Sequence, residues 1–121
     1  MPVTVVVGGQ FGSEGKGKVA HALARREKAQ FAIRVGGSNS GHTVVSELGA
    51  RLVLRQLPTA AILPDVRLIL PAGSYIDPKV LLNEIQLTAL RRDRLFIANT
   101  ELRLGVEPIN ALVVDSRKRR T

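Results

Sequence analysis

The chain has 121 residues, of which 45% are apolar and 23% charged, a balance typical of one small folded domain. It contains no cysteine, which excludes disulfides and thiolate metal sites and fits a reducing cytoplasm. The sequence has no run of about 18 apolar residues and no basic segment before a small-residue cleavage site. Neither a membrane span nor a signal peptide is therefore expected.

The formal net charge of +8 favours an anionic partner. The basic residues do not form one stripe, since residues 25–26, 91–94 and 117–120 are separate groups on expected helix faces. With three Phe, one Tyr and no Trp, the chain also offers few rings for stacking on single-stranded bases. These features favour solvated helix faces over a nucleic-acid-binding module.

The first third of the chain predicts two strands, each followed by a glycine-rich loop. Residues 3–7 are a run of β-formers and predict a buried, parallel strand that leads into the first loop. Residues 16–26 then predict a helix, with one face made of Val19, Ala22, Leu23 and Arg26. Residues 31–35 predict the second strand, and residues 36–43 are the second glycine-rich loop.

The rest of the chain continues the alternation. Residues 44–45 and 52–54 predict a hairpin, and residues 57–64 a connector with two prolines. A strand at 66–70 precedes a helix that Asp77 caps, with Pro78 at its first position and an end near Arg92; a strand at 95–98 follows. Residues 111–114 are apolar, and the chain then enters an expected helix. This order predicts the α/β class with a largely parallel sheet, and both glycine loops at the carboxyl edge of its strands.

The first loop, "GGQFGSEGKGK" at residues 8–18, has the features of a phosphate-binding loop. Backbone N–H groups and the positive end of the following helix converge on an anion, and Lys16 adds a mobile charge. The strict P-loop pattern is missed, because Gly9 is one residue too far from Gly15 and Gly17 replaces the hydroxyl residue. A tight packing turn between strand and helix is the alternative interpretation.

Two side chains near these glycines are weak signals by themselves. Ser13 is by default a helix N-cap, and His42, between Gly41 and Thr43, is by default a local hydrogen-bonding residue. The position of His42 between two loops suited to phosphate favours a functional role.

The two loops together resemble the opening of the adenylosuccinate synthetase family. "GGQFGSEGKGK", "RVGGSNSGHTVV" and "RQLPTAAI" are similar to that family's G-x-Q-W-G-D-E-G-K-G-K, G-G-N-N-A-G-H-T and Leu/Ile-Pro connector, and the resemblance covers residues 3 to about 90. The family's proteins are much longer and homodimeric. The resemblance therefore implies that residues 1–121 are the N-terminal part of a single nucleotide-binding synthetase domain. A complete small domain is the alternative.

The resemblance also implies a reaction and its residues. A nucleoside triphosphate phosphorylates the 6-oxygen of a purine mononucleotide, and the amine of L-aspartate then displaces that phosphate. By motif position, triphosphate and Mg²⁺ are bound by Gly12, Ser13, Glu14, Gly15, Lys16, Gly17 and Lys18, with Gly41, His42 and Thr43 from the second loop. Lys16 neutralises the transferring phosphoryl group, His42 stabilises charge on the 6-oxygen, and the Gly41 carbonyl binds Mg²⁺. Ser38 and Asn39 contact the purine nucleotide.

The chain departs from the family pattern at Phe11, which replaces tryptophan, at Ser38, which replaces an asparagine, and at Ser13, which replaces the catalytic aspartate. In enzymes that act on inosine monophosphate, that aspartate takes the N1 proton and helps to bind Mg²⁺. A serine cannot act as a base at neutral pH without a partner. Either the chain is an inactive homologue, or its substrate differs.

A different substrate is favoured by resemblance to the 2-aminoadenylosuccinate synthetases of viruses that place 2-aminoadenine in their DNA. Members of that branch carry a small residue at this position and use deoxyguanylate (dGMP), which implies the cytoplasm of a host cell. Serine leaves room for the guanine 2-amino group and can accept its hydrogen bond. The implied function is an aspartate ligase acting on dGMP, with Mg²⁺ and ATP, or GTP, as phosphoryl donor. The alternatives are an ordinary adenylosuccinate synthetase, a non-catalytic nucleotide-binding homologue and, last, a nucleic-acid module.

Overall fold

The computed structural model describes residues 2–10 and 14–98. Its elements are α1 (Lys16–Arg26), β1 (Phe31–Ile33), β2 (His42–Val45), β3 (Arg51–Leu54), the 3₁₀ turn η1 (Thr59–Ile62), β4 (Arg67–Leu70), α2 (Pro78–Leu87), the 3₁₀ turn η2 (Arg92–Arg94) and β5 (Leu95–Ile97). Within the described residues, no helix has the length and hydrophobicity to cross a bilayer. The predicted segments at 111–114 and beyond lie outside the described residues.

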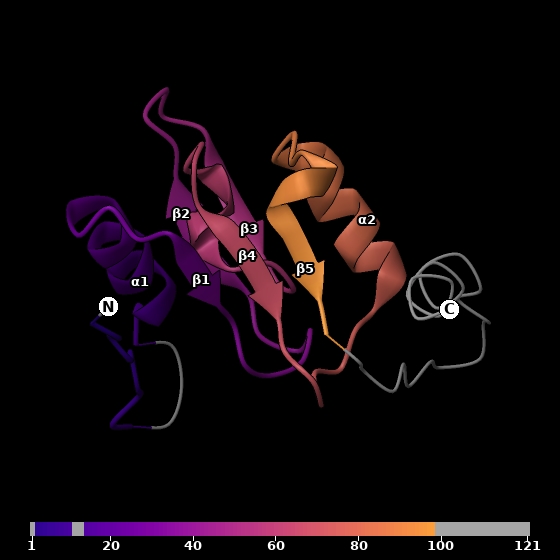
Figure 1. The fold of residues 1–121 in the computed structure, drawn as a ribbon, viewed down its shortest axis with the longest axis horizontal. Helices are drawn as coiled ribbons and strands as arrows, with labels where there is room; N and C mark the ends of the chain where they lie inside the picture. Colours follow the sequence, from indigo (N-terminus) through magenta and orange to yellow (C-terminus); the bar gives the residue numbers. More distant parts are fainter. Residues whose placement is uncertain (1, 11–13, 99–121) are drawn as a thin grey trace.

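Two sheets organise the molecule (Figure 1). Strands β1, β4 and β5 form a parallel sheet in that order, with Ile33 opposite Ile69 and Ile69 opposite Phe96. Strands β2 and β3 form the predicted antiparallel hairpin, with His42 opposite Leu54. The predicted α/β class with a parallel sheet is confirmed.

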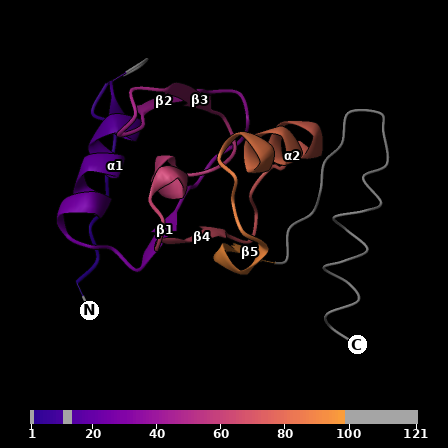
Figure 2. The same cartoon turned by 90° about the horizontal axis from the view of Figure 1, so that it is seen from above.

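The two sheets lie on opposite sides of the interior, with η1 between them (Figure 2). Helix α1 lies beside the hairpin and η1, and α2 lies near the opposite end of the molecule. Side chains from both sheets, η1 and α2 meet in one core, which includes Val44, Leu54, Leu57, Leu68, Leu70 and Leu81. The connector at residues 57–64, predicted as a plain linker, is therefore largely part of this core.

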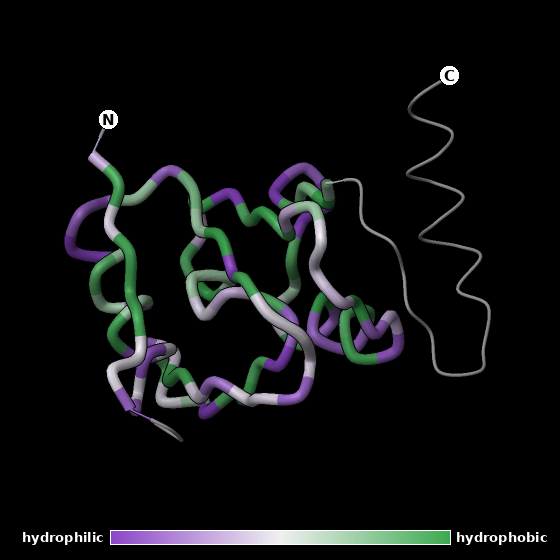
Figure 3. Tube along the Cα trace, turned by 90° about the horizontal axis from the view of Figure 1, so that it is seen from below, coloured by the Kyte–Doolittle hydropathy of each residue, from purple (hydrophilic) through white to green (hydrophobic). Residues whose placement is uncertain are grey.

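Residues 3–7 differ from the sequence prediction. They pair with neither sheet, and Val3, Val5 and Val7 are 85%, 74% and 77% exposed. Figure 3 shows them as an apolar stretch near the N-terminus. The segment instead lies beside α1, where the Thr4 hydroxyl donates to Glu27 Oε2 at 3.0 Å. The predicted burial is thus not observed, because a strand is buried only when partners cover its edges and faces.

Helix α1 has the predicted bounds but buries a different face. Val19 is 48% exposed, whereas Gly17 is buried and Ala24 packs against the core. The three residues at spacing i, i+3, i+7 (Gly17, Ala20 and Ala24) are small, so β2 and η1 approach the helix closely. The predicted face of larger residues is therefore wrong, because contact distance rather than hydrophobicity selects the buried side.

Helix α2 begins as predicted and ends earlier than predicted. Asp77 Oδ1 accepts from the backbone N–H groups of Lys79 and Val80, and Pro78 is the first helical residue. The helix ends at Leu87, and Ala89 takes a left-handed conformation with φ +48°. The Leu90 N–H donates to the Ile85 carbonyl, and the Leu90 side chain is buried. This Schellman ending stops the helix before Arg92, without the glycine that would have signalled it.

Candidate functional site

The first glycine loop ends at Gly15, which is the N-cap of α1 with φ +76°. This left-handed conformation favours glycine, and no side chain of the described residues caps the helix there. The N-cap position that the default interpretation gave to Ser13 is therefore occupied by Gly15. Gly12 and Ser13 lie outside the described residues. Lys16 is the first residue of the helix, so its charge lies beside the free N–H groups of the first turn.

Glu14 ties the two ends of the described part of this loop together. Its Oε2 is 3.2 Å from Lys16 Nζ, and its Oε1 accepts the backbone N–H of Gln10. A Cβ on Gly8 would lie 2.3 Å from Glu14 Oε2. Glycine at position 8 thus leaves space for the carboxylate, which orients the Lys16 side chain.

The first and second loops meet at Gly17. A Cβ there would lie 2.5 Å from His42 Cβ and 3.1 Å from Thr59 Cγ2. The Gly17 carbonyl also accepts the Thr59 hydroxyl at 2.6 Å, which fixes α1 to η1. Lys16 and His42, 26 positions apart in sequence, are therefore brought to one place by the absence of a side chain between them.

His42 is half-buried at the start of β2. Burial lowers the pKa of its imidazole below the ordinary value, and the positive charges of Arg34 and Lys16 lower it further. The imidazole is therefore neutral at neutral pH, with one N–H to donate and one nitrogen to accept.

Two arginines hold the backbone of the second loop. Buried Arg34, just after β1, donates to the Ser40 carbonyl at 2.7 Å and to the Leu54 and Leu57 carbonyls at 2.9 and 3.2 Å. Exposed Arg55 donates from Nε to the Ser38 carbonyl at 2.8 Å. Arg55 belongs to the segment that follows β3, and Arg34 is hydrogen-bonded to carbonyls of the same region.

Glu84 of α2 in turn fixes the segment that follows β3. The side chain is 2% exposed, and its oxygens accept the N–H groups of Arg55, Gln56 and Leu57. Sequence reasoning missed Arg34 and Glu84. The available signals were a charged residue at the end of a strand and an acid on the apolar face of a helix.

The other predicted site residues fall on the same two loops. Lys18 is exposed on α1, while Gly41 precedes β2 and Thr43 lies within it. Ser38 is half-buried and Asn39 exposed, both in the second loop. A Cβ on Gly41 would lie 2.7 Å from Val53 Cγ1, so the hairpin requires glycine there.

The described residues contain no cluster of three His, Cys, Asp or Glu side chains that could bind a metal by themselves. The predicted metal donors, the Ser13 hydroxyl and the Gly41 carbonyl, are hard oxygen atoms. Such donors suit Mg²⁺ that is bound mainly through phosphate and water, and they do not suit zinc.

An α/β fold with two glycine loops joined at a helix N-terminus matches one family. The model of the adenylosuccinate synthetase family matches residues 5–114. The chain belongs to the adenylosuccinate synthetase family. Its matches include adenylosuccinate synthetases of a Synechococcus strain, 47% identical over 104 residues, and of Pyrococcus horikoshii, 34% identical over 119 residues. These matches cover 83% and 98% of this chain but 22% and 33% of the relatives, so the chain spans a fifth to a third of their length.

Two solved structures share the fold. The fully ligated adenylosuccinate synthetase of Plasmodium falciparum has a TM-score of 0.66 and 28% identity, over 92% of this chain and 25% of that one. The cyanophage S-2L succinoaminodeoxyadenylate synthetase (PurZ), bound to dGMP and to dATP as an energy donor, has a TM-score of 0.61 and 36% identity, over 77% and 27%.

Proposed function

We propose that this chain carries the phosphoryl-transfer part of a purine-nucleotide aspartate ligase, an enzyme that joins L-aspartate to C6 of dGMP. The observation that carries the proposal is the contact between Gly17 and His42. The contact supports the proposal because Lys16, suited to phosphate, then acts electrostatically on a neutral imidazole suited to a carbonyl oxygen. In the first step a terminal phosphoryl group passes from a nucleoside triphosphate to the purine 6-oxygen, the nucleoside diphosphate leaves and the N1 proton is lost to water. In the second step the aspartate amine displaces that phosphate from C6 and loses a proton.

Lys16 and His42 act on different charges in the first step. The Lys16 ammonium exchanges its ion pair with Glu14 for the transferring phosphoryl group, at a helix N-terminus that already favours an anion. His42 donates its N–H to the 6-oxygen as negative charge develops there, which is electrostatic stabilisation of the transition state. The lowered pKa of His42 favours this role over that of an imidazolium acid.

Mg²⁺ fits the oxygen donors of this site, and Ser13 and Gly41 are the residues we assign to it. When bound, the ion neutralises charge on the triphosphate. The remaining loop residues assigned to the phosphates are Gly12, Glu14, Gly15, Gly17, Lys18 and Thr43, whereas Ser38 and Asn39 are assigned to the purine nucleotide.

We assign the selection of the acceptor purine nucleotide to Ser13. Its hydroxyl is smaller than the family's aspartate and can accept a hydrogen bond from the guanine 2-amino group. The 36% identity to a cyanophage synthetase that was solved with dGMP and dATP supports this choice and an adenine donor. We infer a product for 2-aminoadenine synthesis in viral DNA, made by a homodimer in the host cytoplasm.

An ordinary synthetase that uses inosinate and GTP remains the alternative, with a non-catalytic homologue after it. The test uses protein expressed from the complete reading frame that contains this sequence. It is incubated with aspartate, Mg²⁺, ATP or GTP, and either dGMP or inosinate, and the succinyl adduct is identified by mass. We expect the dGMP adduct. Conversion of inosinate alone would establish the alternative, and nucleotide binding without turnover would establish the non-catalytic homologue.

A further inference from the structure

The backbone of the second glycine loop is held from outside the loop, at two carbonyls. Arg34 binds the Ser40 carbonyl and Arg55 binds the Ser38 carbonyl, so the residues on both sides of Asn39 are fixed. His42 follows two residues after Ser40. A contact that fixes residue 40 therefore also fixes where the β2 strand, and with it the imidazole, begins.

Arg34 is anchored at its other end. One guanidinium nitrogen, Nη1, donates to both the Leu54 and Leu57 carbonyls, and the other, Nη2, reaches Ser40. Leu54 pairs with His42 in the hairpin. The planar guanidinium thus spans the start of β2 and the end of β3 as a rigid brace, a geometry that lysine cannot reproduce.

Glu84 completes the brace from α2. Its carboxylate accepts three successive backbone N–H groups, those of residues 55–57, and is almost fully buried. The favourable interaction between the Glu84 and Arg34 charges compensates part of the cost of burying the guanidinium. Glu84 on α2 and Arg34 after β1 therefore both bind the backbone of residues 54–57.

We propose that Arg34 and Arg55, with Glu84 behind them, are positioning residues that set the backbone of residues 38–42 and so the placement of Asn39 and His42. This inference rests on the proposed function for its catalytic consequence. Its structural part, the order of the loop, stands without that function. None of the three side chains is assigned to substrate.

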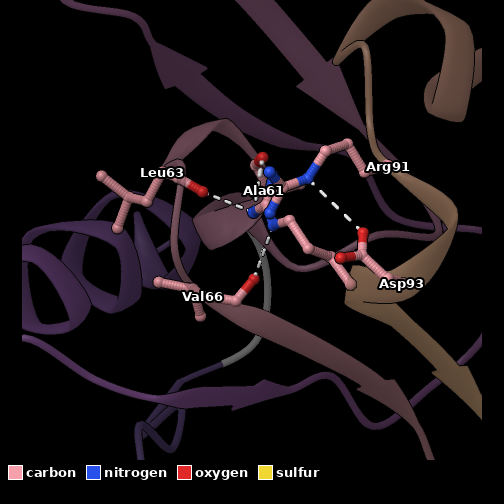
Figure 4. Close-up of polar contacts among 6 residues, drawn as sticks. Ala61, Leu63, Val66, Arg91 and Asp93 are labelled. Carbon is pink, nitrogen blue, oxygen red and sulfur yellow. Dashed lines mark hydrogen bonds and ion pairs between the residues drawn. The ribbon is translucent and has the colours of Figure 1, made fainter.

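The chain contains a matched control in Arg94. Arg94 is a buried residue like Arg34, and its guanidinium also donates to three backbone carbonyls. The three accepting residues, Val66, Ala61 and Leu63, are labelled in Figure 4. These carbonyls belong to η1 and to the segment that joins η1 to β4, and none of them is part of the second loop. Arg94→Met therefore removes the same kind of interaction without touching residues 38–42.

The first measurement is amide hydrogen exchange, without added ligands, of protein expressed from the complete reading frame. In Arg34→Met, exchange at residues 38–43 should rise at least tenfold more than exchange in β4, while Arg94→Met should not show this selective rise. In Arg34→Lys the charge is kept and the brace is lost, so it should behave like Arg34→Met. Equal local effects of Arg34→Met and Arg94→Met would overturn the positioning role.

The second measurement is steady-state kinetics of protein from the complete reading frame. Misplacement of a reacting group by about 1 Å can cost about 10²-fold in rate. Arg34→Met should therefore lower kcat by about that factor with a triphosphate KM within about threefold, and Arg94→Met should keep kcat per folded molecule. If Arg34→Met does not fold, Arg55→Met decides, because Arg55 is exposed: an acceptor kcat/KM unchanged from wild type contradicts the proposal, and a fall of about tenfold supports it.

The two proposals fail differently. Selective loop exchange in Arg34→Met without any ligase activity in the wild type would overturn the proposed function and leave the positioning role. Ligase activity that Arg34→Met and Arg55→Met retain in full would do the reverse.

Discussion

Gly17 and His42 are in contact so close that a single methyl group cannot fit between them. A Cβ on Gly17 would lie 2.5 Å from His42 Cβ, although the two residues come from separate glycine-rich motifs. Gly17 is also the second residue of α1, and glycine in a helix is less favourable than alanine by up to about 1 kcal/mol. The contact with His42 accounts for a residue that helix propensity disfavours.

Gly17→Ala should therefore lower the free energy of unfolding, by about 1–3 kcal/mol for overpacking, less the gain in helix propensity. Gly9→Ala is the matched control within the same motif, since no atom of the described residues, apart from the two chain neighbours, lies within 4 Å of a Cβ at that position. Urea denaturation of both variants measures the difference. A Gly17→Ala variant as stable as Gly9→Ala would mean that α1 and β2 are not packed as described.

Lys16→Ala should abolish phosphoryl transfer and leave folding intact. The lysine is partly exposed and, among residues 2–10 and 14–98, forms an ion pair only with Glu14, so its loss costs little stability. Losing a charge-assisted contact to phosphate should lower the rate on the order of 10³-fold. Lys79→Ala, an exposed lysine on α2, is the control for loss of charge. Turnover near that of the wild type in Lys16→Ala would remove Lys16 from the phosphate site.

His42→Asn should lower kcat far more than it changes triphosphate affinity, because the imidazole is assigned to charge that appears only in the transition state. Single-turnover rates and equilibrium binding of the triphosphate separate the two effects. An effect confined to binding would contradict the assignment to the 6-oxygen.

The stability of the chain should fall on mild acidification. Burial lowers the pKa values of both His21 and His42 below 6.5, so the unfolded chain binds more protons than the folded chain as the pH falls below that value. The free energy of unfolding should therefore decrease between about pH 7.5 and 5.5, above the range where carboxylates titrate. Replacing both histidines by glutamine should flatten this slope, and an unchanged slope would show that neither histidine is responsible.

Local sequence rules predicted several of the helices and strands, but not the contacts that hold them together. Asp77 with Pro78, the hairpin and the first helix follow from local rules that do not depend on the rest of the fold. The buried face of α1 was predicted wrongly because Gly17 contributes by having no side chain, which a hydrophobicity pattern cannot register. The hydrogen bond from Arg34 to Ser40 was missed because its acceptor is a backbone carbonyl. Every residue carries one, so no residue type in the sequence marks the acceptor.

Residues 3–7 show a further limit of local patterns. Five consecutive β-formers predict a strand, but pairing and burial depend on which partners cover the segment, and here it lies exposed beside α1. Prediction of the substrate is limited in the same way. The sequence shows the substitution at Ser13 but not the groups that surround that side chain.

The most direct test of the central claim is the acceptor preference of the wild type and Ser13→Asp, measured as the ratio of kcat/KM for dGMP and inosinate at fixed triphosphate, Mg²⁺ and aspartate. Aspartate restores a base for the N1 proton of hypoxanthine and adds bulk beside the guanine amine. A hydrogen-bonded purine edge supplies about 1–3 kcal/mol, so the ratio should shift toward inosinate by roughly 10- to 100-fold. We predict a wild type that prefers dGMP and a variant that moves by this amount. A wild type that prefers inosinate, or a ratio that does not change, would contradict the account.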